Sequence, residues 1–426
     1  MLDISFREAL AVWWRIGLLS FGGPAGQIAL MHRILVEEKR WVDEARFLHA
    51  LNYCMMLPGP EAQQLATYIG WLLHGVKGGL VAGILFIVPG AVLILLLSLL
   101  YVLLGDVSLV QGLFFGLKAA VLAIVLQALF RISQKALKNQ LAWALAIGGF
   151  IALFAFNLPF PLVVLGAGLI GYLSAKLYPD SAAKEDAKIT PELRPGTKTA
   201  AVGCATLWAL TVFGLLWLLG GDQVFSQLAL FFSKLAVVTF GGAYAVLGYV
   251  AQQGVEHYGW LQPGEMVDGL GLAETTPGPL ILVTQFVGFL AGFREYGIGG
   301  AVLAAILTTW VTFLPCFVWI FAGAPYVEKL RHHQALSKAL AGITAAVVGV
   351  IANLALWFSL NVLFAERQVL EGYGLRLLLP ELASINLAML ALTLVACLLL
   401  FGFKRGLFTL LGSCALLGMG WQLLVG

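Results

Sequence analysis

Two short motifs rich in glycine and proline interrupt the apolar sequence, and each occurs twice. Ser-Phe-Gly-Gly at positions 20–23 returns as Thr-Phe-Gly-Gly at 239–242, and Pro-Gly-Pro at 58–60 returns at 277–279, with the same offset in both cases. A half-helix that starts after such a break directs backbone N–H groups and its positive dipole end at the break. The four breaks therefore predict an anion site built from backbone. The alternative is a set of kinks that only ease helix packing, but duplicated breaks are typical of repeat-built transporters.

Cations within the apolar segments favour an anionic substrate. Arg15 and Lys234 are separated by the same offset as the motifs, and each precedes a Gly-Gly break. Charge inside a membrane is costly and usually functional, although each side chain could instead satisfy carbonyl groups at the end of its helix. Lys118 is a third cation in apolar sequence, with no counterpart in the other half, and Glu61 and Glu274 are its candidate partners.

Two carboxylates lie beside the Pro-Gly-Pro motifs. Glu61 follows the first motif and Glu274 precedes the second. Burial favours the neutral form of a carboxyl group at such a break, whereas a nearby cation favours the charged form. A group under both influences can bind and release a proton, which suits a proton carrier. The alternatives are a Glu at a helix N-terminus for Glu61 and a salt bridge for Glu274.

Neutral hydrogen-bonding side chains near the breaks complete the predicted site. The chain has no Gly-x-x-x-x-Gly-Lys-Ser/Thr loop, and its five cysteines are scattered without metal-ligand spacing, so we predict no catalytic residue, metal site or cofactor. Glu61 and Glu274 are the proton-coupling candidates. The predicted substrate-binding residues are Arg15, Gly22, Gly23, Pro24, Gln27, Pro58, Gly59, Pro60, Gln64, Lys118, Lys234, Gly241, Gly242, Thr275, Thr276, Pro277, Gly278 and Pro279.

The composition indicates a membrane protein. The chain is 61% hydrophobic and only 11% charged, and its mean hydropathy is +0.94, whereas soluble proteins carry about 25% charged residues. The net charge of +3 is too small to suggest a nucleic-acid partner. We therefore expect the lipid bilayer to be the main environment of the chain.

Nine segments are apolar enough to predict full membrane spans, and Gly112 and Gly116 predict close helix packing in the second of them. Four further apolar segments are interrupted by the breaks, and their arms of about 15 residues reach only roughly 22 Å. We therefore expect helical hairpins that enter the membrane and return, with their tips inside the protein. The nine predicted spans are residues 80–104, 109–130, 141–156, 162–177, 199–219, 299–321, 336–360, 385–400 and 407–425.

The positions of Lys and Arg predict the orientation of the two halves. The loop after the first hairpin contains Arg33, Lys39, Arg40 and Arg46, whereas the equivalent loop, 252–265, contains neither Lys nor Arg. The first loop is then cytoplasmic and the second faces out. The extra span at 199–219 would give the second half the opposite orientation in the membrane to the first half.

The predicted fold is an all-α polytopic membrane protein made of two inverted-topology repeats. Each repeat has two broken re-entrant helical hairpins and four spanning helices. Residues 1–178 form the first repeat, 179–220 a charged linker and one extra spanning helix, and 221–426 the second repeat. The linker, 179–198, is predicted to be cytoplasmic. Because one chain contains both repeats, no dimer is required to complete the site.

The motifs resemble the signatures of the chromate transporter family. The first-half signature is carried by residues 20–27 (Ser-Phe-Gly-Gly-Pro-Ala-Gly-Gln) and 57–71, and the second-half signature by 240–247 and 269–279. The resemblance covers both halves and so indicates a long-chain, two-domain member. Asn52-Tyr53-Cys54-Met55-Met56 before Leu57 departs from the family pattern, in which a Gln commonly precedes the Leu-Pro-Gly-Pro.

The resemblance implies export of chromate across the inner membrane, driven by the proton gradient or by anion exchange, and chromate resistance. The residues alone predict an anion transporter and leave other readings open. Sulfate is a tetrahedral dianion like chromate, so a transporter of sulfate or another oxyanion is one alternative. An anion channel is a second. A membrane-embedded enzyme is a third, but it would need a nucleophile with a base, or a metal cluster, at the breaks.

Overall fold

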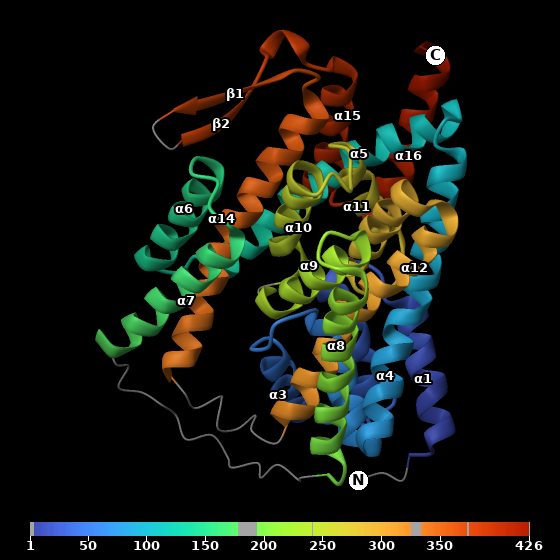
Figure 1. Cartoon of the computed structure of the whole chain (residues 1–426), viewed down its shortest axis with the longest axis vertical. Coiled ribbons are helices and arrows are strands. Elements are labelled where there is room, and N and C mark those ends of the chain that lie inside the picture. The colour runs from blue at the N-terminus through green and yellow to red at the C-terminus, as the bar shows by residue number, and fades with distance from the viewer. Residues whose placement is uncertain (1–3, 178–193, 241, 325–333, 373–374, 426) are drawn as a thin grey trace. The chain divides into compact units, whose positions relative to one another are not determined.

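The computed structural model describes residues 4–177, 194–240, 242–324, 334–372 and 375–425. Most of them are helical, and one antiparallel pair of strands is the only sheet among them (Figure 1). The chain divides into two compact units, and each unit draws on both halves of the sequence. Unit 1 comprises Met1–Leu96, Tyr172–Ala243 and Thr276–Leu340, and unit 2 comprises Leu97–Gly171, Tyr244–Thr275 and Ala341–Gly426.

Four helices, α4, α7, α10 and α14, cross a boundary between the units. The elements that begin in unit 1 are α1 (Phe6–Leu19), α2 (Gly23–His32), η1 (Arg33–Glu38), α3 (Glu44–Cys54), α4 (Glu61–Leu104), α8 (Thr197–Leu219), α9 (Val224–Val238), α10 (Ala243–Gln252), η3 (Leu280–Leu282), α12 (Val283–Gly323) and α14 (Gln334–Leu363). Those that begin in unit 2 are α5 (Ser108–Ala136), α6 (Gln140–Phe154), α7 (Phe160–Leu177), η2 (Gln253–His257), α11 (Glu265–Thr275), β1 (Arg367–Gly372), β2 (Leu375–Pro380), η5 (Leu382–Ser384), α15 (Leu387–Cys397), η6 (Leu398–Gly402) and α16 (Leu407–Val425).

Unit 1 begins with a helical hairpin. The Ser5 hydroxyl caps α1 by accepting a hydrogen bond from the Glu8 N–H. The segment α2–η1 then returns beside α1, because Lys39 Nζ lies 2.8 Å from a carboxylate oxygen of Glu8. The interruption between α1 and α2 is therefore the tip of a hairpin, and the two ends of that hairpin lie together.

The long helices α4 and α12 each double back on themselves. The backbone of α4 is non-helical at His74 and Gly75, and that of α12 at Gly297. In α4 the two arms approach so closely that a Cβ on Gly70 would lie 2.5 Å from the carbonyl oxygen of Gly78. Small residues allow helix backbones to meet in this way. The α12 arms meet similarly, at glycines 288, 292 and 300.

Six helical segments of the described chain are long and apolar enough to cross a membrane. Three of the nine predicted spans, those of α6, α7 and α15 with η6, form shorter apolar helices that are not among these six. The chain leaves α6 early because Asn157 adopts a positive φ of 49° and Pro159 follows it. The helix α8 exposes apolar side chains on most of its surface, for example Trp217 at 85%, as expected of a lipid-facing helix.

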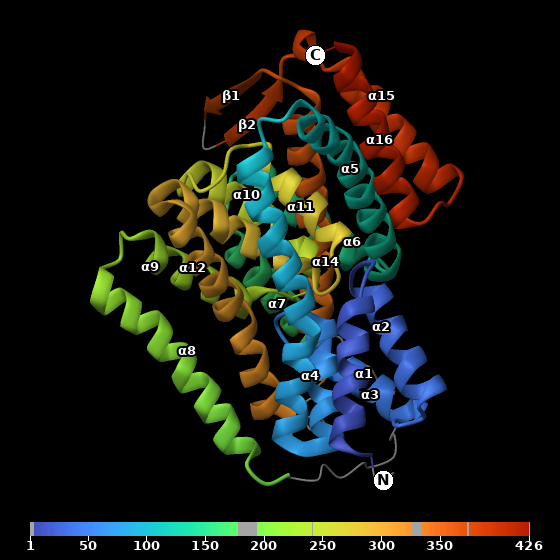
Figure 2. The ribbon, with the colours of Figure 1, turned by 90° about the vertical axis from the view of Figure 1, so that its right-hand side faces the viewer.

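Unit 2 is organised around α5. Figure 2 shows α15 and α16 alongside it, and both pack against it. The seam is the predicted one: Gly112 lies against Gly418, and Gly116 against the backbone of Cys414. The sequence analysis did not foresee β1 and β2, which pair antiparallel from Arg367↔Pro380 to Gly372↔Leu375. The linker at 178–193 and Gly241 lie outside the described residues.

Candidate functional site

Helices end at all four Gly/Pro motifs, and all four motifs belong to unit 1. The chain leaves α1 at Leu19 and α3 at Cys54, and it enters α2 at Gly23 and α4 at Glu61. In the second half, α9 ends at Val238 before α10 begins, and α11 ends at Thr275 before η3 begins. Glycine and proline at these points stop each helix because neither supports a continuous helical backbone.

The four breaks contact one another in two pairs that join the halves. The Gly59 N–H donates to the Thr239 carbonyl oxygen at 2.7 Å, and the Gly278 N–H donates to the Ser20 carbonyl oxygen at 2.8 Å. Each bond thus links a Pro-Gly-Pro motif of one half to a Gly-Gly motif of the other, through equivalent backbone atoms. The sequence predicted the breaks but not that they would bond to each other.

The residue types at positions 20 and 239 favour these bonds. The Ser20 hydroxyl donates to the carbonyl oxygen of Ile16, and the Thr239 hydroxyl donates to that of Leu235, both at 2.6 Å. Each hydroxyl therefore satisfies a carbonyl at the end of its own helix. The main-chain carbonyl of the same residue then accepts the bond from the other half.

We call the place where the four breaks bond to one another the crossing. Two buried amides from the first half of the chain add hydrogen bonds to it. Gln27 Nε2 donates to the Gly278 carbonyl oxygen at 2.6 Å and to that of Ser20 at 3.4 Å. Gln64 Nε2 donates to the Pro58 carbonyl oxygen at 2.7 Å. The Oε1 atoms of both amides are buried and accept no hydrogen bond from the described residues. Valine occupies the matching positions, 246 and 283, so this contribution is asymmetric.

Close approach to the crossing requires glycine at two positions. Gly278 has a φ of +92°, which side chains with a Cβ rarely adopt. Gly90, in the second arm of α4, lies directly against the break, where a Cβ would overlap the carbonyl oxygen of Pro277. The crossing is thus tightly packed on the α4 side.

The start of α2 offers backbone donors at the first Gly-Gly break. Gly22 is its N-cap residue, in the left-handed conformation, and no side chain caps the helix. Pro24 lies in the first turn, where proline removes no intrahelical bond. The first N–H groups of a helix have no intrahelical acceptor and suit an anion. A Cβ on Gly22 or Gly23 would meet no atom within 4 Å, so the space beside this turn is open.

The structure does not bring Arg15 or Lys234 into the crossing. The Arg15 side chain is 48% exposed, and its guanidinium pairs with Glu38 at 3.0 Å. Lys234 is also exposed, on α9. Both remain predicted substrate residues, at equivalent places in the two halves.

In unit 2, Lys118 pairs with a residue that the sequence analysis missed. Its Nζ lies 3.3 Å from Oδ2 of Asp268, and Tyr101 donates a hydrogen bond to the same oxygen at 3.1 Å. Of the two candidate partners, Glu274 accepts a hydrogen bond from Tyr244, and Glu61 is the first residue of α4 in unit 1. The signal available was Asp268 itself, an acidic residue just before the apolar stretch 269–273.

The other predicted polar residues are buried or form hydrogen bonds with groups of their own unit. Buried Glu274 accepts a hydrogen bond from the Tyr244 hydroxyl in unit 2. The Thr275 hydroxyl donates to the Leu272 carbonyl oxygen at 2.8 Å. Thr276 is buried at the start of the second Pro-Gly-Pro break.

A sequence model of the protein family described as "Chromate transporter" matches residues 7–172 and 226–419. The chain belongs to the chromate transporter family. No solved structure matches it significantly.

Three curated relatives are similar to this chromate transporter family member over most of its length. A "Chromate transport protein" of Pseudomonas aeruginosa is 33% identical, covering 82% of this chain and 80% of the relative. A "Probable chromate transport protein" of Synechococcus elongatus is 30% identical, covering 82% and 83%. A "Chromate transport protein" of Cupriavidus metallidurans is 28% identical, covering 93% and 88%.

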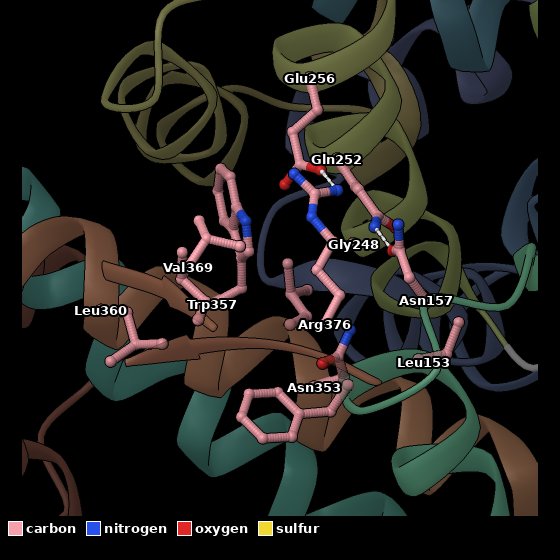
Figure 3. A pocket seen from close by; sticks show the side chains of 13 residues that line it. Leu153, Asn157, Gly248, Gln252, Glu256, Asn353, Trp357, Leu360, Val369 and Arg376 are labelled. Atoms are coloured by element: carbon pink, nitrogen blue, oxygen red, sulfur yellow. Dashed lines mark hydrogen bonds and ion pairs between the residues drawn. The ribbon is translucent and has the colours of Figure 1, made fainter. Parts of the chain in front are cut away.

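Unit 2 contains a cavity that is distinct from the crossing in unit 1 (Figure 3). Figure 3 shows Arg376, from β2, paired with Glu256 at 3.2 Å, and Gln252 hydrogen-bonded to Asn157. The opposed charges of Arg376 and Glu256 compensate each other. None of the predicted site residues lines this cavity. Among the described residues, no cluster of three or more His, Cys, Asp or Glu side chains could hold a metal ion.

Proposed function

We propose that this protein is a secondary active transporter that exports chromate from the cytoplasm across the inner membrane. The observation that carries the proposal is the crossing in unit 1, where four helix breaks bond pairwise and the start of α2 presents uncapped N–H groups. Such a site suits a tetrahedral dianion. Family membership supports chromate as the substrate. Export would give chromate resistance, and the activity is transport rather than catalysis.

The proposal includes two inverted repeats, residues 1–178 and 221–426, separated by residues 179–220. The reciprocal bonds of Gly59 and Gly278 support it, because equivalent backbone atoms in both halves make them. The distribution of Lys and Arg supports an inverted second half and a cytoplasmic linker at 179–198. Transporters with this architecture hold their substrate where discontinuous helices meet.

In the proposed site, the backbone at the breaks and the amide of Gln27 surround the substrate path. The driving force is the proton gradient or exchange with a second anion. Proton coupling requires a carboxylate that can release a proton, and Glu61 and Glu274 are the candidates that the sequence predicted. Sulfate has the same shape and charge as chromate, so it is the competing substrate.

Inverted membrane vesicles test the proposal. We expect chromate uptake into vesicles that contain the protein, faster or more concentrative with an imposed proton gradient, and only weakly inhibited by excess sulfate. Empty-membrane vesicles are the control. Uptake erased by a modest excess of sulfate would make the protein a sulfate or general oxyanion transporter. Chromate movement indifferent to any gradient and without saturation would make it a channel.

We further propose that Arg15 and Lys234 attract the dianion toward the breaks. Both cations are exposed and precede a Gly-Gly break in equivalent places. Positive charge around a site raises the local concentration of an anionic substrate by about 10-fold or more. The double substitution Arg15→Ala/Lys234→Ala should raise the KM for chromate about tenfold. The maximal rate should change less than about twofold, and the dependence of KM on ionic strength should weaken. An unchanged KM would contradict this role.

A further inference from the structure

The ion pair between Lys118 and Asp268 is the most deeply embedded charge pair that the described residues of unit 2 contain. Asp268 is 5% exposed, whereas the Lys118 side chain retains 26% exposure. A buried ion pair seldom adds net stability, because desolvation offsets the attraction between the charges. Charges in apolar helices are therefore retained mainly for function.

The surroundings of Asp268 leave one of its oxygens available. Oδ2 accepts both contacts, from Lys118 on α5 and from the Tyr101 hydroxyl at the end of α4. Oδ1 is buried and accepts no hydrogen bond from the described residues. The remaining charged group that acts on the Asp268 carboxyl is Glu265, one turn earlier on α11. A proton on this carboxyl would remove its negative charge and weaken its hold on Lys118.

Lys118 cannot be left without an anion at this position. Its Nζ also lies against Gly264, at the start of α11, where a Cβ would come within 3.1 Å of it. The positive end of the α11 dipole disfavours a cation there. When the Asp268 carboxylate is neutralised or displaced, another anion must take its place, and the partly exposed side of Lys118 is where that anion can approach.

We propose that Lys118 and Asp268 form the site that couples proton movement to anion movement. The substrate dianion displaces the Asp268 carboxylate from Lys118, and the freed carboxylate binds one proton. Release of the anion returns the carboxylate to Lys118 and releases the proton. No covalent bond other than the carboxyl O–H forms or breaks. This inference rests on the proposed transport function and places its proton coupling at Asp268 rather than at Glu61 or Glu274.

The test compares Asp268→Asn with wild type and with Glu274→Gln, which removes the competing candidate for proton coupling, another buried carboxylate on the same helix. Purified protein is reconstituted into vesicles, and chromate flux is measured together with proton flux, using a trapped pH-sensitive dye. Wild type should accumulate chromate in response to a pH gradient and move protons with it. Asp268→Asn should retain chromate–chromate exchange within about threefold, but its accumulation ratio should fall to about 1 and its proton flux should disappear. Glu274→Gln should remain coupled.

A second variant guards against a folding defect in the single mutant. Lys118→Gln/Asp268→Asn leaves neither partner charged, so it avoids an unpaired buried cation. It should bind chromate more weakly than Asp268→Asn, because the dianion loses its cation, and the chromate flux that remains should carry no protons. Coupled transport in both Asp268 variants, or loss of coupling only in Glu274→Gln, would overturn the inference. An absence of chromate flux in wild type would instead contradict the proposed function itself, so the two failures can be told apart.

Discussion

Replacement of Gly90 by alanine is expected to abolish chromate transport. A Cβ at this position would overlap the carbonyl oxygen of Pro277 and the side chain of Leu282. The obstacle is backbone, which cannot rotate away, so the second arm of α4 and the break must separate. Extra atoms in a close-packed site typically cost about 1–3 kcal/mol. Here the same displacement also pulls Gly278 away from the Ser20 carbonyl oxygen.

Gly203→Ala is the matched control for this prediction. Gly203 lies inside α8, and a Cβ there would meet no atom within 4 Å. Initial rates of chromate uptake, normalised to the amount of protein in the membrane, should fall more than about tenfold in Gly90→Ala and stay within about twofold of wild type in Gly203→Ala. Normal transport by Gly90→Ala would show that the close contact with Pro277 is not needed.

Gln27→Leu is expected to lower transport by about 10- to 100-fold while leaving the protein folded. Leucine keeps most of the side-chain volume but removes the Nε2 donor, which bonds the Gly278 and Ser20 carbonyl oxygens. Leaving a buried acceptor unsatisfied costs about 1–3 kcal/mol. Because Gln27 is the side chain that holds both breaks of one pair together, the loss falls directly on the proposed site.

A buried glutamine elsewhere in unit 1 provides the comparison. Gln63 is fully buried, but its Nε2 bonds Thr67, one turn later on the same helix, and not another break. Gln63→Leu should therefore affect thermal stability in detergent about as much as Gln27→Leu and transport much less. Equal transport defects in the two variants would mean that Gln27 contributes only to packing.

The positions of the breaks could be predicted because their causes are local. Glycine and proline weaken a helix locally, which favours the observed ends of α1, α3, α9 and α11 beside the motifs. They do not always end a helix, since Pro89 and Gly90 lie inside α4. The constant offset between the duplicated motifs also indicated that the two halves correspond. Helix hairpins in α4 and α12 were harder to foresee, because each depends on one glycine in a glycine-rich stretch.

The contacts made by the charged residues could not be predicted in the same way. Arg15 precedes a break in the sequence, but the rotation of α1 about its axis directs its side chain to Glu38. The partner of Lys118 lies in the other half of the chain, and no local pattern marks Asp268 as that partner. Such pairings depend on how the helices pack, which a single sequence does not reveal. The hairpin of β1 and β2 was not predicted, because its segment is as rich in leucine as the apolar helices and so gives no distinct strand pattern.

The central claim is that a tetrahedral dianion binds where the four breaks cross in unit 1. Equilibrium binding of radiolabelled chromate to the purified protein tests it most directly, with Gln27→Leu and Gln63→Leu measured beside wild type. We expect saturable binding of chromate that weakens at least about tenfold in Gln27→Leu and is nearly unchanged in Gln63→Leu. Binding that is equally strong in all three proteins would contradict the placement of the site at the crossing.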